Sequence, residues 1–217
     1  MSETTLYLVR HGETDYNRQS IVQGRGIDAV LNETGRAQAE AVARRLAEVS
    51  FDALYTSTLR RAAETAETIA RFHVGTPLHR LADLEEMAWG VFEGRLITPS
   101  VRQVLEAIVV RWRSGEFGYR IEGGESIYDV QQRGRQAIRH ILDRHPGETV
   151  LVVTHGRYLR VLLATLLDAY SLERMEEIPH ANTGVNALRY REGRFEVDLL
   201  NCTAHLETSA FNATHML

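Results

Sequence analysis

At 217 residues, 44% of them apolar and 25% charged, the chain has room for one well-buried domain and is short for two. Its net charge of −4 argues against a general nucleic-acid binder, its single cysteine (Cys202) excludes a disulfide scaffold and indicates a reducing compartment, and no apolar stretch approaches the roughly 20 residues that cross a bilayer. We therefore expect one cytoplasmic domain, residues 1–217, without a signal segment, membrane contact or nucleic-acid partner.

The first half of the chain alternates strand and helix patterns. Residues 6–9 (LYLV) predict a short buried strand that ends at Arg10-His11-Gly12. From Asn32 onward, apolar residues recur at spacings of three and four, which predicts a helix capped by Asn32 or Thr34. Residues 53–55 predict a second short strand, and Thr56-Ser57-Thr58 is expected to cap the helix that follows.

The second half continues the alternation after an insertion. Residues 95–122 predict a mostly helical cap insertion, and a long amphipathic helix follows at about 126–144. Residues 149–153 (TVLVV) predict the clearest buried strand, which runs into Thr154-His155-Gly156 and another helix, and residues 186–200 predict a hairpin. Strands alternating with helices predict a three-layer α/β/α sandwich around a mostly parallel central sheet.

Two of the predicted strands end in the same way, with a histidine followed by a glycine. His11 and His155 each come directly after a buried apolar run. In open α/β sheets, ligands bind beyond the carboxyl ends of the strands, where loops and helix N-termini offer free backbone N–H groups. If the two strands are neighbours, the two imidazoles converge in the expected pocket of the fold.

Six motifs follow one another along nearly the whole chain. They are Arg10-His11-Gly12-Glu13-Thr14 with Asn17; Gln23-Gly24 with the stretch 31–39; Ser57-Thr58-Leu59-Arg60-Arg61-Ala62; the stretch 86–94; Gly123-Gly124-Glu125-Ser126; and Val153-Thr154-His155-Gly156. In this order and spacing they resemble the histidine phosphatase superfamily, specifically its phosphoglycerate mutase-like branch, which includes broad-specificity and phosphoserine-type phosphatases.

The resemblance implies a role for each matching residue. His11 would be the nucleophile that takes up the phosphoryl group, and Glu86 would be the general acid. Arg10, Arg61 and a protonated His155 would surround the transferring group, whose transition state spreads negative charge over its oxygens. The residues implied to bind substrate are Arg10, Asn17, Gln23, Gly24, Arg61, His155, Gly156 and His205.

Two neighbouring pairs leave the assignment open. Arg60 and Arg61 are about 100° apart on a helix, so one is expected to face the site and the other solvent, and the motif spacing favours Arg61. Glu85 and Glu86 compete for the role of acid, and counting back from Gly90 favours Glu86. His205 could border the pocket or be an ordinary surface residue.

The activity implied is hydrolysis of a small phosphomonoester without a metal or cofactor, and a homodimer is left open. A phosphoglycerate mutase is the first alternative, but the short apolar-faced insertion at 95–122 favours a phosphatase. A non-catalytic module that binds phosphorylated ligands is the second alternative. A metal hydrolase is the third, although the nine histidines include no H-E-x-x-H or similar close-spaced ligand cluster.

Overall fold

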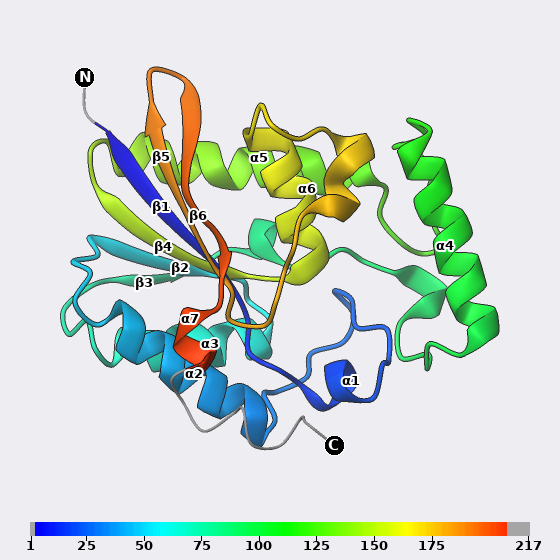
Figure 1. Ribbon diagram of the computed structural model, residues 1–217, viewed down its shortest axis with the longest axis horizontal. Helices are drawn as coiled ribbons and strands as arrows, with labels where there is room; N and C mark the ends of the chain where they lie inside the picture. The colour runs from blue at the N-terminus through cyan, green and yellow to red at the C-terminus, as the bar shows by residue number, and fades with distance from the viewer. Residues whose placement is uncertain (1–2, 208–217) are drawn as a thin grey trace.

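The structure, a computed structural model, describes residues 3–207, so the two ends of the predicted 1–217 domain (residues 1–2 and 208–217) lie outside the described residues. Six strands form one sheet in the order β3-β2-β4-β1-β5-β6 (Figure 1). They are β1 (Thr4–Arg10), β2 (Ala53–Thr56), β3 (Leu78–Arg80), β4 (Thr149–Thr154), β5 (Val185–Arg191) and β6 (Arg194–Cys202). The pairs β1–β4, β2–β4 and β2–β3 are parallel, whereas β5 pairs antiparallel with β1 and β6, so the prediction of a mostly parallel sheet is confirmed.

Helices cover both faces of the sheet (Figure 1). The longer ones are α2 (Glu33–Leu46), α3 (Arg60–Ala70), α4 (Pro99–Arg113), α5 (Ile127–Arg144) and α6 (Gly156–Leu166). The short ones are α1 (Asp15–Arg18), α7 (Ala204–Glu207), and the 3-10 turns η1 (Ala82–Leu84), η2 (Gly90–Phe92) and η3 (Leu172–Glu177). None of the described helices combines the length and the apolar character needed to cross a bilayer.

The two faces of the sheet bury two separate cores, as the alternation of side chains along β4 requires. Val150 and Val152 pack with α5 and α6, whereas Leu151 and Val153 pack with α2 and α3. Successive side chains of a strand point to opposite faces, so an uninterrupted apolar strand needs a helical layer on each side. This arrangement is the α/β/α sandwich that the sequence predicts.

Local capping is partly as predicted. The side chain of Asn32 accepts a hydrogen bond from the Gly35 N–H and caps α2, which resolves the choice between Asn32 and Thr34. The prediction that Thr56-Ser57-Thr58 caps α3 is wrong, because Leu59 is the N-cap residue and no side chain caps that helix. The Ser57 hydroxyl accepts a hydrogen bond from the Leu59 N–H and also contacts His155 across the site.

The predicted insertion contains a single long helix, α4, which stands apart from the sandwich at one end of the molecule (Figure 1). Thr98 caps α4 and Pro99 occupies its first turn, where a missing N–H does no harm. Ile108 and Trp112 are its buried residues and join the core on the α5–α6 side. Helix α4 therefore forms a wall opposite the ends of the strands.

Candidate active site

The two strand-end histidines meet in the folded chain. Strands β1 and β4 are parallel neighbours with Arg10 opposite Thr154, so the next residue of each strand leaves the sheet at the same edge. The ring centroids of His11 and His155 are 5.1 Å apart, and the exposed fractions of the two residues are 2% and 0%. The predicted convergence of the two imidazoles is thereby confirmed.

His11 is held as a neutral imidazole with one free ring nitrogen. Its Nδ1 lies 2.6 Å from the Gly12 carbonyl oxygen; a carbonyl can only accept, so Nδ1 carries the proton and Nε2 keeps its lone pair. Burial first, and then the charges of Arg61 and Arg10, hold the pKa of His11 well below its usual value. The Asn182 side chain donates to the His11 carbonyl oxygen and fixes the backbone at this point.

His155 is also neutral. Arg61 Nε donates to Nδ1 of His155 at 3.2 Å, so the ring proton is on Nε2, which donates to the Ser57 hydroxyl at 2.8 Å. The pKa of His155 is well below its ordinary value because of burial, followed by the charges of Arg61 and, if protonated, His11. Burial and the nearby arginine disfavour a second positive charge here, and a protonated His155 beside the transferring phosphoryl group stays a prediction.

Arg61 is the arginine of its pair that faces the site. It is fully buried, and its two Nη groups donate to the carbonyl oxygens of Ile27 and Gly24. Burial lowers its pKa to about 10, which still leaves it charged at neutral pH. Arg60, by contrast, is exposed, and its backbone N–H donates to Asp28 at the surface.

Arg10 has a donor to spare. Its Nη1 donates to the His180 carbonyl oxygen at 2.6 Å, whereas its Nε is buried and has no hydrogen-bond partner among the described residues. Burial lowers the pKa of Arg10 to about 10, so the group stays cationic. A Cβ atom on Gly156 would lie 3.2 Å from this Nε. A buried, unsatisfied cationic donor is unfavourable unless an anion completes it, which makes this position suited to a phosphate oxygen.

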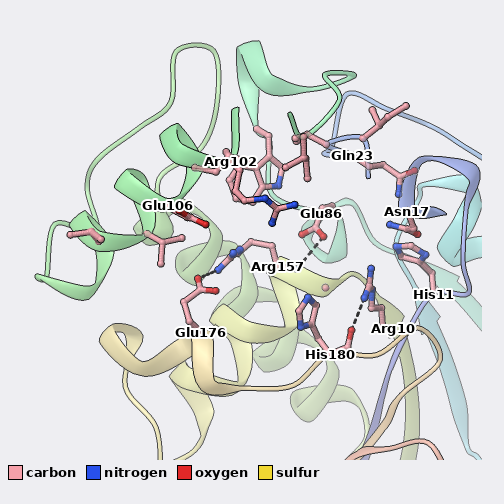
Figure 2. A pocket seen from close by; sticks show the side chains of 18 of the residues that line it. Arg10, His11, Asn17, Gln23, Glu86, Arg102, Glu106, Arg157, Glu176 and His180 are labelled. Carbon is pink, nitrogen blue, oxygen red and sulfur yellow. Dashed lines mark hydrogen bonds and ion pairs between the residues drawn. The ribbon is translucent and has the colours of Figure 1, made fainter. Parts of the chain in front are cut away.

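Glu86 lies at the N-terminus of α6 and lines the cavity (Figure 2). Its Oε1 accepts from the N–H groups of Met87 and Tyr158, both at 2.9 Å, and its Oε2 accepts from the Arg157 N–H at 3.1 Å. The carboxyl group is thus fixed, with Oε2 carrying fewer donors than Oε1. Glu85 points elsewhere, because its carboxylate pairs with Arg25 and Thr58.

A buried arginine on α5 holds the segment that carries Glu86. Arg133 donates to the carbonyl oxygens of Asp83, Glu85 and Glu86 and pairs through two nitrogens with Glu125. The same Glu125 carboxylate accepts from the Ala88 N–H, on the other side of Glu86. This network fixes the backbone before and after the carboxyl group.

Two amide side chains complete the small end of the cavity, which is the end that holds Arg10 and His11 (Figure 2). The side-chain oxygen of Asn17 accepts from the Thr14 N–H, and the side-chain oxygen of Gln23 accepts from the Thr14 hydroxyl. Each amide therefore keeps its NH₂ group for another acceptor. Gly24 does not line the cavity; its carbonyl oxygen orients Arg61, and a Cβ atom there would lie 2.1 Å from Glu93 Oε1.

The cavity has a volume of about 720 Å³, which is in the range of ligand sites of roughly 300–1,000 Å³. Its small end is formed by Arg10, His11, Asn17, Gln23, Glu86 and Gly156, and its far wall by one face of α4. Arg61 and His155 are not among the lining residues; they are buried behind His11, in contact with each other. A cationic group, neutral donors and a nucleophilic nitrogen around one hollow can bind a phosphoryl group and accept it covalently.

Comparison with known proteins agrees with this geometry. Residues 6–203 match the model of the histidine phosphatase superfamily (branch 1). The chain belongs to this superfamily. It is 32% identical over 209 residues to the metal-independent phosphoserine phosphatase of Arabidopsis thaliana, covering 96% of this chain and 85% of that protein. It is 34% identical, again over 209 residues, to phosphoglycerate mutase-like protein 4 of the same plant, covering 95% and 88%.

Solved structures of this histidine phosphatase fold are also similar. Bacillus stearothermophilus YhfR superposes with a TM-score of 0.83 at 37% identity, covering 94% of this chain and 99% of that one. The Entamoeba histolytica phosphoserine phosphatase in complex with 3-phosphoglyceric acid superposes with a TM-score of 0.80 at 27% identity, covering 94% and 99%.

Two further histidines of this histidine phosphatase take different places. His180 lines the cavity, and burial, followed by the charge of Arg10, lowers its pKa to about 3, so it is neutral. His205 is not among the lining residues of the cavity; its ring contacts the Thr183 hydroxyl and Arg45 instead. Across residues 3–207 no group of three His, Cys, Asp or Glu side chains is placed to hold a metal ion.

Sequence reasoning missed three supports of the site. Ser57 was expected to cap a helix and instead contacts His155. Thr65 accepts a hydrogen bond from the Gly12 N–H and so helps to hold the His11 loop. Arg133 could have been found, because it lies three residues after Val130 and four before Ala137, on the buried stripe of α5.

Proposed function

We propose that this chain is a phosphatase that hydrolyses a small phosphomonoester, such as phosphoserine or a sugar phosphate, through a phosphohistidine on His11. The observation that carries the proposal is the free Nε2 lone pair of a buried, neutral His11 that lines the same hollow as Arg10, with Arg61 buried close enough for its charge to lower the pKa of His11. Relatives named as phosphoserine phosphatases support this substrate class.

In the first step, His11 Nε2 attacks the phosphorus in line with the ester oxygen. An N–P bond forms, the P–O bond of the ester breaks, and protonated Glu86 gives its proton to the leaving alkoxide. Arg10 and Arg61 stabilise the negative charge on the transferring oxygens, and the NH₂ groups of Asn17 and Gln23 add neutral hydrogen bonds.

In the second step, water attacks the phosphorus of the phosphohistidine. Glu86 accepts the proton of the water, the N–P bond breaks, and inorganic phosphate leaves with His11 neutral again. The Gly12 carbonyl keeps the proton of the imidazole on Nδ1 throughout, so Nε2 is free for each new cycle.

A short cap favours hydrolysis over transfer to a second substrate. The cap side of the cavity is one helix, α4, with the apolar Leu105, Val109 and Val110 beside the charged Arg102, Glu106 and Arg113. A mutase must instead keep its phosphohistidine from water until the product is phosphorylated. Assays with 3-phosphoglycerate, with and without 2,3-bisphosphoglycerate, distinguish the two: release of phosphate supports a phosphatase, and isomerisation supports a mutase.

The test of the nucleophile is chemical trapping. Rapid denaturation during turnover of a radiolabelled phosphomonoester should leave an acid-labile, alkali-stable label on the wild-type chain, mapped to the peptide that contains His11. His11→Asn, checked for native circular dichroism, should carry no label and show no turnover. Label on another residue, or turnover by a folded His11→Asn variant, contradicts the proposal.

A further inference from the structure

Two guanidinium groups of the cavity, those of Arg102 and Arg113 on α4, make no hydrogen bond or ion pair within residues 3–207. Arg102 lies on α4, lines the cavity, and extends toward the side where Glu86 lies (Figure 2). Among residues 3–207 its side chain makes no hydrogen bond or ion pair, whereas Arg111 of the same helix pairs with Glu116 and Arg120 pairs with Asp129. The guanidinium group of Arg102 lies on the side of the cavity where Glu86 would protonate the leaving alkoxide, and it is therefore available to a ligand.

The other cation of this part of the cavity, Arg157, already has partners in the protein. Its guanidinium group pairs with Glu176, which also binds Arg160. The same group lies 5.5 Å from the ring centroid of Trp89 and 5.3 Å from that of Trp112, which are cation–π distances. Arg157 is thus held in place by an anion and two aromatic faces.

Arg113 is on the cavity side of α4 but at its opposite end. It comes eleven residues after Arg102, which is three turns and about 16 Å along the helix axis. The pKa of Glu177 is lowered mainly by the hydrogen bond from Arg174 and to a smaller degree by the charge of Arg113, so Arg113 lies near that carboxylate. Of the two cavity arginines on α4, Arg102 is the one near the proposed phosphoryl site.

The space between the phosphoryl site and Arg102 is bordered by apolar side chains. The cavity that holds both is lined by Val22 and Ile97, from the segments on either side of β2 and β3, and by Leu105 of α4. The carbon skeleton of a small alcohol can lie against these residues while a negatively charged substituent reaches the guanidinium group. A planar arginine fork matches a carboxylate through two parallel hydrogen bonds.

We propose that Arg102 determines substrate preference by binding a carboxylate on the alcohol part of the phosphomonoester. This inference rests on the proposed phosphatase function. It means that the enzyme prefers phosphorylated hydroxy acids and amino acids to phosphorylated alcohols without an acid group. Arg102 takes no part in transfer of the phosphoryl group.

A matched pair of ligands tests the inference. O-phosphoserine and O-phosphoethanolamine differ only by the carboxylate, and each can be measured as a competitor of nitrophenyl phosphate hydrolysis, whether or not it is itself turned over. For the wild-type enzyme, we expect phosphoserine to compete about tenfold more strongly, as one charge-assisted hydrogen-bonded pair in a partly exposed site would give.

The variants separate Arg102 from its neighbours. Arg102→Gln should remove the preference for phosphoserine while leaving competition by phosphoethanolamine and kcat for nitrophenyl phosphate unchanged, and Arg102→Lys should restore part of it. Arg120→Gln, which removes a cation of the cap outside the cavity, should keep the preference in full. Loss of the preference in Arg113→Gln rather than in Arg102→Gln, or no preference in the wild type, overturns the inference and leaves the phosphatase function intact. Absence of nitrophenyl phosphate turnover would instead refute the proposed function.

Discussion

Replacing Glu86 by glutamine separates its proposed chemical role from its structural one. The carboxylate accepts three backbone N–H groups, from Met87 and Tyr158 at Oε1 and from Arg157 at Oε2. An amide has one acceptor oxygen, which can keep the two bonds from Met87 and Tyr158. Its NH₂ group then faces the Arg157 N–H, so two donors meet and that N–H loses its acceptor. We expect Glu86→Gln to lower the free energy of unfolding by about 1–3 kcal/mol, the usual effect of leaving a buried donor unpaired.

The kinetic consequence should depend on the leaving group. A positioned general acid contributes about 100- to 10,000-fold, so kcat/KM for an alkyl phosphate such as phosphoserine, which reports the steps up to formation of the phosphohistidine, should fall by that factor in Glu86→Gln. The kcat/KM for nitrophenyl phosphate, whose phenolate leaves without a proton, should fall less than about tenfold, whereas kcat should fall for both substrates because Glu86 also serves as base in the shared second step. Measuring both substrates on one protein sample cancels any change in the active fraction.

The matched control is Glu85→Gln, whose carboxylate contacts Arg25 and Thr58 outside the catalytic arrangement. It should leave the ratio of the two kcat/KM values unchanged. An equal fall in kcat/KM for both substrates in Glu86→Gln would show that Glu86 acts only as a structural anchor for α6. A changed ratio in Glu85→Gln would move the proton donor to that residue.

The buried histidines and the close backbone packing of the site lead to three more expectations. In NMR titrations of the free protein, His11 should show no midpoint near 6.5, because its pKa is lowered mainly by burial and then by the charges of Arg61 and Arg10. Arg10→Gln should raise the pKa of His11, and a normal midpoint in the wild type contradicts the assignment. The free energy of unfolding should fall as the pH drops below about 6.5, by up to about 1.4 kcal/mol per pH unit for each buried histidine. The reason is that histidines of the unfolded chain take up protons in this pH range and the buried ones do not. Urea denaturation with a constant midpoint from pH 7 to 5 would refute this. In Gly12→Ala the new Cβ would lie 2.4 Å from the Gly35 carbonyl oxygen, so activity and thermal stability should both fall, whereas Gly118→Ala, with its nearest neighbour at 3.9 Å, should change neither.

The sequence was sufficient wherever a local pattern fixed the outcome. The apolar run before His155 predicted β4, and the common end of two strands placed His11 and His155 at one edge of the sheet. Both conclusions need only side-chain alternation and the rule that parallel strands end together. The choice of Arg61 over Arg60 and the cavity position of Glu86 followed from motif spacing in the same way.

What could not be predicted depends on contacts between distant segments. The proton of His155 is placed by Ser57 and Arg61, which come from β2's end and α3, and no local pattern shows that Ser57 turns toward the ring rather than capping a helix. The neutral state of His155 likewise follows from burial among arginines that the chain brings together only when folded. The lack of a partner for Arg102 is visible only in the folded chain, where Arg10 and Arg157 have partners and Arg102 has none within residues 3–207.

The strand order has a consequence for how the chain is made. Strand β1 is synthesised first, yet both of its neighbours, β4 and β5, come after residue 148. A nascent chain emerging from the ribosome must therefore hold an apolar edge, Leu6 to Val9, without hydrogen-bonding partners until about two thirds of the protein has followed. Such long-range pairing slows folding and exposes strands to association with other chains. The phosphoryl hollow cannot be complete before β4 and the segment up to His180 have been made, so chains that stop before β4 should be inert and prone to aggregate.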